Sequence, residues 1–221
     1  MTSAPMTRAE FAELAGVSRE TELRFQAYAD LLVKWNRAIN LVSASTLQDA
    51  WRRHFWDSAQ LQAYLPTDGG VLLDVGSGAG FPGLVLAMLI GAYTVHLCES
   101  DKRKATFLRE AARITGTAVV VHDRRLEDLE PFPADVITAR ALASVAVLLE
   151  LTERFMAPKT QLLLLKGRLA HNELTEAQKV WTMETVLHPS RSDESGTIVQ
   201  IKKVTRHDRT GIGSAAGVSG D

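Results

Sequence analysis

The chain has 221 residues, of which 46% are hydrophobic, and this is enough apolar material for a core that needs no disulfide or metal. Its 25 Lys and Arg residues and 26 Asp and Glu residues give a net charge of -1, so composition alone gives no support for nucleic-acid binding. Cys98 is the one cysteine, which excludes an intrachain disulfide and a cysteine-built zinc cluster. No apolar run is long enough for a signal peptide or a membrane anchor, so we expect a cytoplasmic protein without membrane attachment.

The sequence pattern of residues 1–66 predicts an N-terminal helical cap. Five apolar residues recur at three- and four-residue steps and make one stripe along a helix: Phe25, Tyr28, Leu32, Trp35 and Ile39. Ser18, followed by Glu20 and Glu22, indicates a helix start. A second helix is expected over 46–64, ending before Pro66, and its aromatic residues are expected to pack in the core.

Residues 67–208 alternate strands with helices, which predicts an α/β, Rossmann-like domain with a mostly parallel seven-stranded sheet and helices on both faces. The expected strands are 71–75, 93–98, 118–121, 134–138, 161–165, 182–187 and 197–201. Such sheets bind ligands beyond the carboxyl ends of their strands. The remaining residues, 209–221, are rich in Gly, Ser and Ala and are predicted to be a disordered tail.

A glycine loop follows the first expected strand. Gly76, Gly78 and Gly80 permit a tight turn and a close approach of the backbone to a ligand. Glu99 ends the next strand, where a carboxylate would accept hydrogen bonds from the two hydroxyls of a ribose. The alternative is that the glycines only form a turn and that Glu99 is a surface residue that binds no ligand. The order strand, loop, helix, strand and acid favours a nucleoside ligand.

Two departures from the dinucleotide fingerprint bear on the ligand. Phe81 stands where that fingerprint needs a third glycine, and Asp74 lies two residues before the first glycine. A pyrophosphate needs a helix N-terminus free of negative charge. S-adenosylmethionine has no phosphate, carries a sulfonium and an ammonium, and tolerates a nearby carboxylate. The form D-x-G-x-G-x-G also resembles motif I of class I methyltransferases, so S-adenosylmethionine is favoured over NAD.

Several further segments, in order along the chain, resemble one family. Residues 35–41 are similar to its W-N-x-x-x-N-L signature, residues 53–58 to R-H-x-x-D-S, residues 81–83 to its [FL]-P-G segment, residues 139–144 to [SA]-R-A-x-A-S, and residues 166–167 to the end of L-K-G. The family is that of the bacterial small-subunit ribosomal RNA guanine-N7 methyltransferases, also called glucose-inhibited division protein B. The resemblance covers about residues 25 to 204.

The resemblance implies a class I S-adenosylmethionine methyltransferase that modifies N7 of a guanine in 16S ribosomal RNA near the decoding site. Its partner would be that RNA within the small ribosomal subunit, and we expect a monomer without a metal. Cofactor contacts carried over by matching position are Gly76, Gly78 and Phe81 along the loop, Glu99 at the ribose, Leu126 and Glu127 at the adenine, and Arg140.

Guanine N7 carries an in-plane lone pair and no proton, so no general base is needed and no catalytic residue is predicted. Arg140 and Lys166 are candidate substrate contacts. Arg140 is suited to the guanine edge or to the methionyl carboxylate, and the resemblance favours the carboxylate. Lys166 is suited equally to RNA contact or to a solvated strand end. His54 and Asp57, three apart on the expected helix, are expected to pair with each other.

Nine basic residues are candidates for a discontinuous RNA surface, although each one separately is more typical of a solvated helix face: Lys34, Arg37, Arg52, Arg53, Lys102, Arg103, Lys104, Arg124 and Arg125. Two rival functions stay open at this point. One is a methyltransferase of the same fold that acts on a small molecule or a protein. The other is a regulator that binds a nucleotide without catalysis.

Overall fold

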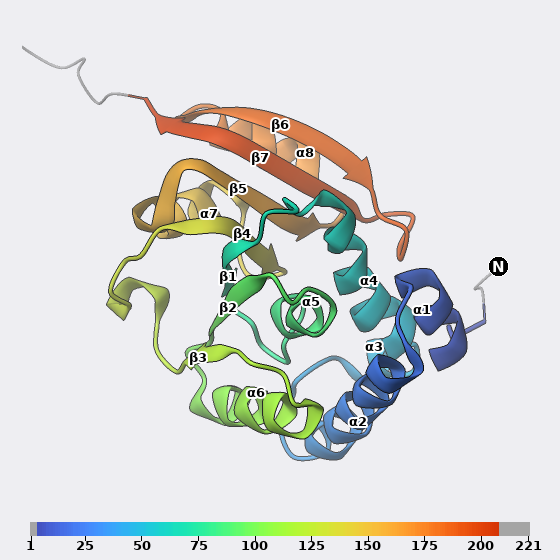
Figure 1. Cartoon of the computed structure of the whole chain (residues 1–221). Helices are drawn as coiled ribbons and strands as arrows, with labels where there is room; N and C mark the ends of the chain where they lie inside the picture. The colour runs from blue at the N-terminus through green and yellow to red at the C-terminus, as the bar shows by residue number, and fades with distance from the viewer. Residues whose placement is uncertain (1–3, 208–221) are drawn as a thin grey trace, which may run out of the picture.

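The computed structural model describes residues 4–207, so the predicted tail at 209–221 lies outside the described residues. One seven-stranded sheet has the order β3-β2-β1-β4-β5-β7-β6 (Figure 1). Strands β1 to β5 are parallel, whereas β7 runs antiparallel to both β5 and β6. The strands are β1 (Gly70–Val75), β2 (Tyr93–Cys98), β3 (Val120–His122), β4 (Ala134–Arg140), β5 (Met156–Lys166), β6 (Trp181–Pro189) and β7 (Thr197–Arg206). The predicted α/β class and its mostly parallel sheet are confirmed.

Helices cover both faces of the sheet because successive strand residues point to opposite sides. On β1, Leu72 belongs to the buried apolar cluster that includes residues of α5 (Gly83–Leu89) and α6 (Lys102–Thr115). Leu73 belongs to the second cluster, which includes residues of α7 (Val145–Thr152) and α8 (Ala170–Ala177). Strand β5 alternates in the same way, with Leu163 on the first face and Leu162 on the second. The near-continuous apolar runs of these central strands follow from burial on both sides.

The N-terminal region contains α1 (Arg8–Ala15), α2 (Arg19–Asn36), α3 (Ala44–Leu47) and α4 (Asp57–Ala59), drawn in blue to cyan in Figure 1. Ser18 caps α2 as predicted, since its side chain accepts a hydrogen bond from the Thr21 amide. The single helix expected over 46–64 is confirmed only in part: residues 50–64 are continuously helical, but they do not form one regular α-helix. A π-helical segment (Trp51–Trp56) precedes α4, and a 3-10 segment (Gln60–Tyr64) follows it. The consecutive residues His54, Phe55 and Trp56 at the end of the π-helical segment are all buried.

The N-terminal helices and the sheet share one hydrophobic core. Phe55, fully buried, lies at the contact: its ring centroid is 5.2 Å from that of Tyr28 on α2 and 5.3 Å from that of Phe81, which follows the glycine loop. Both pairs have the edge-to-face geometry that aromatic rings favour. The aromatic side chains of the cap therefore reach the residues that follow β1.

Replacing Phe55 by alanine is expected to lower the free energy of unfolding by about 3–5 kcal/mol, the usual cost of emptying a buried aromatic site. Because the core is shared, tryptophan fluorescence (three of four tryptophans lie in residues 35–56) and far-UV circular dichroism should report one coincident transition in urea. Leu23→Ala is the control, because that side chain is 55% exposed. Separate transitions for the two probes would contradict the shared core.

Candidate active site

A cavity of about 540 Å³ opens at the carboxyl ends of the parallel strands. It lies where the strand order reverses, between β1 and β4, which is the position at which open α/β sheets bind ligands. The ends of β1, β2 and β4 line it together with the segment after β3. Six of the eight residues predicted to contact cofactor or substrate are among its lining residues: Gly76, Gly78, Glu99, Leu126, Glu127 and Arg140.

The glycine loop is held against the end of β2. The amides of Gly76 and Ser77 both donate to the Cys98 carbonyl, at 2.9 and 3.0 Å. Gly76 has φ +67°, and a Cβ there would lie 2.8 Å from Cδ1 of Leu142, across the cavity wall. Gly76 therefore needs to be glycine for two reasons, its left-handed backbone and its close neighbour.

Asp74, fully buried at the end of β1, supports the loop from below. Its Oδ1 accepts a hydrogen bond from Thr138 Oγ1 at 2.7 Å, and its main-chain carbonyl accepts one from Ser77 Oγ at 3.1 Å. Its Oδ2 has no hydrogen-bond partner among residues 4–207. Burial raises the pKa of Asp74 to about 6, so its carboxyl group titrates closer to neutrality than an exposed aspartate.

Glu99 joins the glycine loop to the start of α6. Its Oε2 accepts a hydrogen bond from the Gly78 amide, and its Oε1 accepts one from the Asp101 amide, each at 2.8 Å. The side chain is 7% exposed and faces the cavity. A carboxylate has about four lone-pair positions, so two fixed acceptors leave capacity for a further pair of hydroxyl donors.

Arg140 ends β4 and is the cationic residue at the inner side of the cavity. Its Nη1 donates to the Arg53 carbonyl at 3.1 Å and lies 3.5 Å from Asp57 Oδ2. Its guanidinium carbon lies 5.0 Å from the centre of the Phe81 ring. All its hydrogen bonds to residues in the described range use Nη1, so the other guanidinium N–H groups are free to bind a ligand carboxylate or a base.

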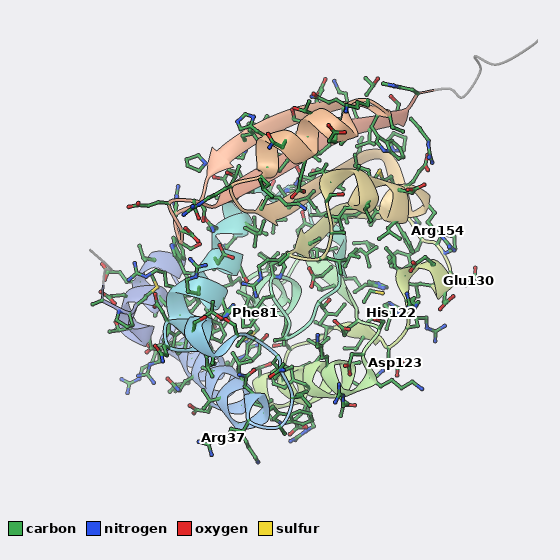
Figure 2. The ribbon with its side chains drawn as sticks, turned by 180° about the vertical axis from the view of Figure 1, so that it is seen from behind. Arg37, Phe81, His122, Asp123, Glu130 and Arg154 are labelled. Atoms are coloured by element: carbon green, nitrogen blue, oxygen red, sulfur yellow. The ribbon has the colours of Figure 1, made fainter. Side chains whose placement is uncertain are left out.

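Phe81 and Lys166 are not among the cavity-lining residues. Phe81 is 3% exposed and stacks on His54, with ring centroids 5.0 Å apart; Figure 2 shows it inside the molecule, between the N-terminal helices and the sheet. Lys166 is 6% exposed and lies 2.8 Å from Glu173 Oε2, and it donates to the Ala143 carbonyl. Of the two alternatives for Lys166, the solvated strand end is therefore wrong, and contact with RNA stays a prediction.

The predicted pairing of His54 with Asp57 is also wrong. His54 Nε2 lies 2.9 Å from Thr46 Oγ1, whereas Asp57 Oδ1 accepts a hydrogen bond from Ser192 in the β6–β7 loop. The two side chains therefore bind different parts of the chain. Burial, reinforced by Arg140 and Arg53, lowers the pKa of His54 to about 3, so its ring is neutral.

A family model described as rRNA small subunit methyltransferase G (GidB) matches residues 21–199. Proteins with that name from Rhodospirillum centenum and Rhodospirillum rubrum are each 55% identical to the chain, over 91% of its length and over 93% and 100% of theirs. The chain belongs to this family. It is accordingly a methyltransferase that depends on S-adenosylmethionine.

Solved structures agree with the fold of this methyltransferase. A putative class I S-adenosylmethionine-dependent methyltransferase from Listeria monocytogenes aligns with a TM-score of 0.58 at 13% identity, covering 91% of this chain and 72% of its own. An S-adenosylmethionine-dependent O-methyltransferase from Thermotoga maritima gives 0.54 at 13% identity, covering 82% and 73%. At this identity they show the class I methyltransferase fold alone.

The residues of the cavity fit S-adenosylmethionine. The Gly76 backbone forms a cradle that a Cβ would fill, and the apolar Leu126 and the Glu99 carboxylate line the same cavity. The acceptors of Glu99 suit the ribose, and the free N–H groups of Arg140 suit a carboxylate. The cavity volume falls within the usual range of about 300–1,000 Å³ for small-molecule sites.

Sequence reasoning assigned no role to the loop 141–143, which forms one wall of the cavity. The signal was present, because residues 139–144 belong to one of the segments that resemble the family. It also missed Glu173, the ion-pair partner of Lys166, for which no sequence pattern gave a signal.

We predict that Gly76→Ala weakens S-adenosylmethionine binding at least tenfold, because it adds a methyl group against Leu142 at a left-handed backbone position. Gly78→Ala, also at positive φ but with only one atom near its Cβ position, should have a smaller effect. Gly91→Ala has free space and no positive φ, so it is the control. Isothermal titration calorimetry measures the three dissociation constants, and equal affinities would contradict the cradle.

Proposed function

We propose that this methyltransferase transfers a methyl group from S-adenosylmethionine to N7 of a guanine in 16S ribosomal RNA, near the decoding site of the small ribosomal subunit. The observation that carries the proposal is the 55% identity, over nearly their whole lengths, to proteins named for ribosomal RNA of the small subunit. We further propose that it acts as a cytoplasmic monomer without a metal.

The chemistry of N7 suits the groups that the cavity holds. S-adenosylmethionine supplies the methyl group as an electrophile on its sulfonium. Guanine N7 has a lone pair and no proton, so the chain has no proton to remove before transfer. His54, the buried histidine nearest to Arg140, is neutral and directed to Thr46 rather than into the cavity. The work of the protein is then to position both reactants and to exclude water.

Each lining residue has a proposed task that matches its geometry. Glu99, fixed by two amides, would accept hydrogen bonds from the ribose hydroxyls. Leu126 would contact the adenine face, with Glu127 at its edge. Arg140 would bind the methionyl carboxylate with the N–H groups that Asp57 and Arg53 leave free. Gly76 and Gly78 would contact the cofactor through their backbone.

Basic side chains around the cavity mouth fit an RNA backbone. Arg124 and Arg125 line the cavity, and Lys104 lines both the cavity and an adjoining groove of about 370 Å³ between the end of α2 and the start of α6. Arg37 lines that groove and lies at the outer edge of the molecule in Figure 2. Within residues 4–207 none of these four side chains forms a salt bridge with a carboxylate. We propose that they contact RNA phosphates.

The direct test uses methyl-labelled S-adenosylmethionine and small ribosomal subunits from a strain that lacks the enzyme. We expect label in 16S RNA, and a single stop of primer extension after chemical cleavage at N7-methylguanine. Free 16S RNA and intact subunits are tested side by side to find the substrate state. Label in a small molecule or a protein, with none in RNA, would overturn the proposal in favour of that substrate class.

Arg37→Gln is expected to weaken RNA binding several-fold at physiological salt and to reduce the slope of log affinity against log salt concentration by about 0.7–0.9, since one phosphate contact is lost. Its affinity for S-adenosylmethionine should not change, because Arg37 does not line the cavity. Lys159→Gln is the matched control: Lys159 is exposed near the start of β5, whereas the cavity lies at the carboxyl ends of the parallel strands. An unchanged salt slope for Arg37→Gln would remove it from the RNA surface.

A further inference from the structure

The loop 141–144 joins β4 to α7 and forms one wall of the cofactor cavity. Ala141, Leu142 and Ala143 all line the cavity. Ala141 has φ +51°, a left-handed conformation that residues with a Cβ rarely adopt. The side chain of Leu142 is 46% exposed and lies against Gly76 of the glycine loop. A strained backbone of this kind persists only where neighbouring groups hold it.

One end of the loop is held by a side chain from another helix. Ser144 occupies the N-cap position of α7 but makes no side-chain hydrogen bond to the helix. The first helical amide, at the fully buried Val145, donates instead to Oε2 of Glu173 on α8, at 3.0 Å. Because the first amides of a helix have no partner within it, a buried one needs an external acceptor. Glu173 therefore caps the N-terminus of α7 in place of Ser144.

The same carboxylate oxygen is bound by a second element. Lys166, the last residue of β5, places its Nζ 2.8 Å from Glu173 Oε2 and donates to the main-chain carbonyl of Ala143. Lys166 is 6% exposed and Glu173 24% exposed, so water screens the pair only in part. We call these two side chains the Lys166–Glu173 clip. They hold the loop at the carbonyl before Ser144 and at the amide after it.

We propose that Glu173 is a positioning residue for cofactor binding: through the clip it sets the conformation of loop 141–144 and thereby the distance between Leu142 and the glycine loop. The proposal rests on the cofactor role of the cavity. It explains why a lysine at the end of β5 is buried, and why a helix N-terminus with a serine at its cap position uses a glutamate 28 residues further along the chain. Neither side chain lines the cavity, so neither acts by touching the cofactor.

Glu173→Ala is expected to raise the dissociation constant of S-adenosylmethionine about tenfold, which corresponds to about 1.4 kcal/mol. Hydrogen exchange of the Val145 amide should become faster in the same variant, because its acceptor is gone. Glu173→Gln keeps a carbonyl oxygen that can accept from Val145 and Lys166, so it should restore most of the affinity and the protection. Glu176→Ala is the matched control, since Glu176 lies on the same helix and pairs with Lys179 in solvent.

The measurements use the full-length protein with S-adenosylmethionine alone, so they need no RNA. If the wild-type chain binds no S-adenosylmethionine, the cofactor site itself fails. If the wild-type chain binds it and Glu173→Ala binds equally well, the positioning role is overturned, whatever the exchange rate. It is also overturned if Val145 exchange is unchanged or if Glu176→Ala has the same effect. Should Glu173→Ala not fold, Glu173→Asp, whose shorter side chain cannot span Val145 and Lys166, is measured with the same expected losses.

Discussion

The segment from Gly76 to Gly83 is approached so closely from several directions that three of its glycines, Gly76, Gly80 and Gly83, leave no room for a side chain. A Cβ at Gly76 would meet Leu142 of the β4–α7 loop, one at Gly80 would meet Tyr28 of α2, and one at Gly83 would lie 2.5 Å from Asp74 and from Leu97. Residues from α2, β1, β2 and the β4–α7 loop thus converge on eight consecutive residues. The position of the cap, the geometry of the cavity wall and the start of α5 all depend on this close packing of backbone.

Charge in the interior is arranged around the same segment. Asp74 lies beneath the loop with a raised pKa, and Arg140 lies beside Phe81 with its pKa lowered by burial and partly restored by Asp57. His54 stays neutral, since both burial and the neighbouring arginines disfavour its charged form. The Arg140 side chain is only 18% exposed, so water would screen its attraction for a ligand carboxylate less than at the surface.

The sequence alone could predict most of the sheet and the side of it that holds the site. Strands 71–75 and 93–98 could be predicted because a short apolar run bounded by glycine or an acidic residue is typical of a buried strand. The position of the site could be predicted because open parallel sheets bind ligands at the carboxyl ends of their strands. The helix expected over 46–64 was right for residues 50–64 but not in its helix type, because local periodicity does not predict a π segment such as 51–56, in which His54, Phe55 and Trp56 are all buried. The resemblance supplied the family, which the glycine loop by itself did not specify.

Phe81 and Lys166 lie outside the cavity because position along the chain does not determine where a side chain points. Phe81 directly follows the loop, yet its ring stacks on His54 and Tyr28, because a side chain next to a ligand-binding backbone can point into the core. Lys166 ends β5 on the side of the sheet where the ligand binds. Because α8 places Glu173 beside it, the lysine forms a largely buried ion pair instead of being exposed at the surface. Position along a strand determines which edge a residue occupies. Its role depends on the neighbours that later elements bring. At Lys166 that neighbour is Glu173, which connects loop 141–144 to α8, a helix that does not line the cavity.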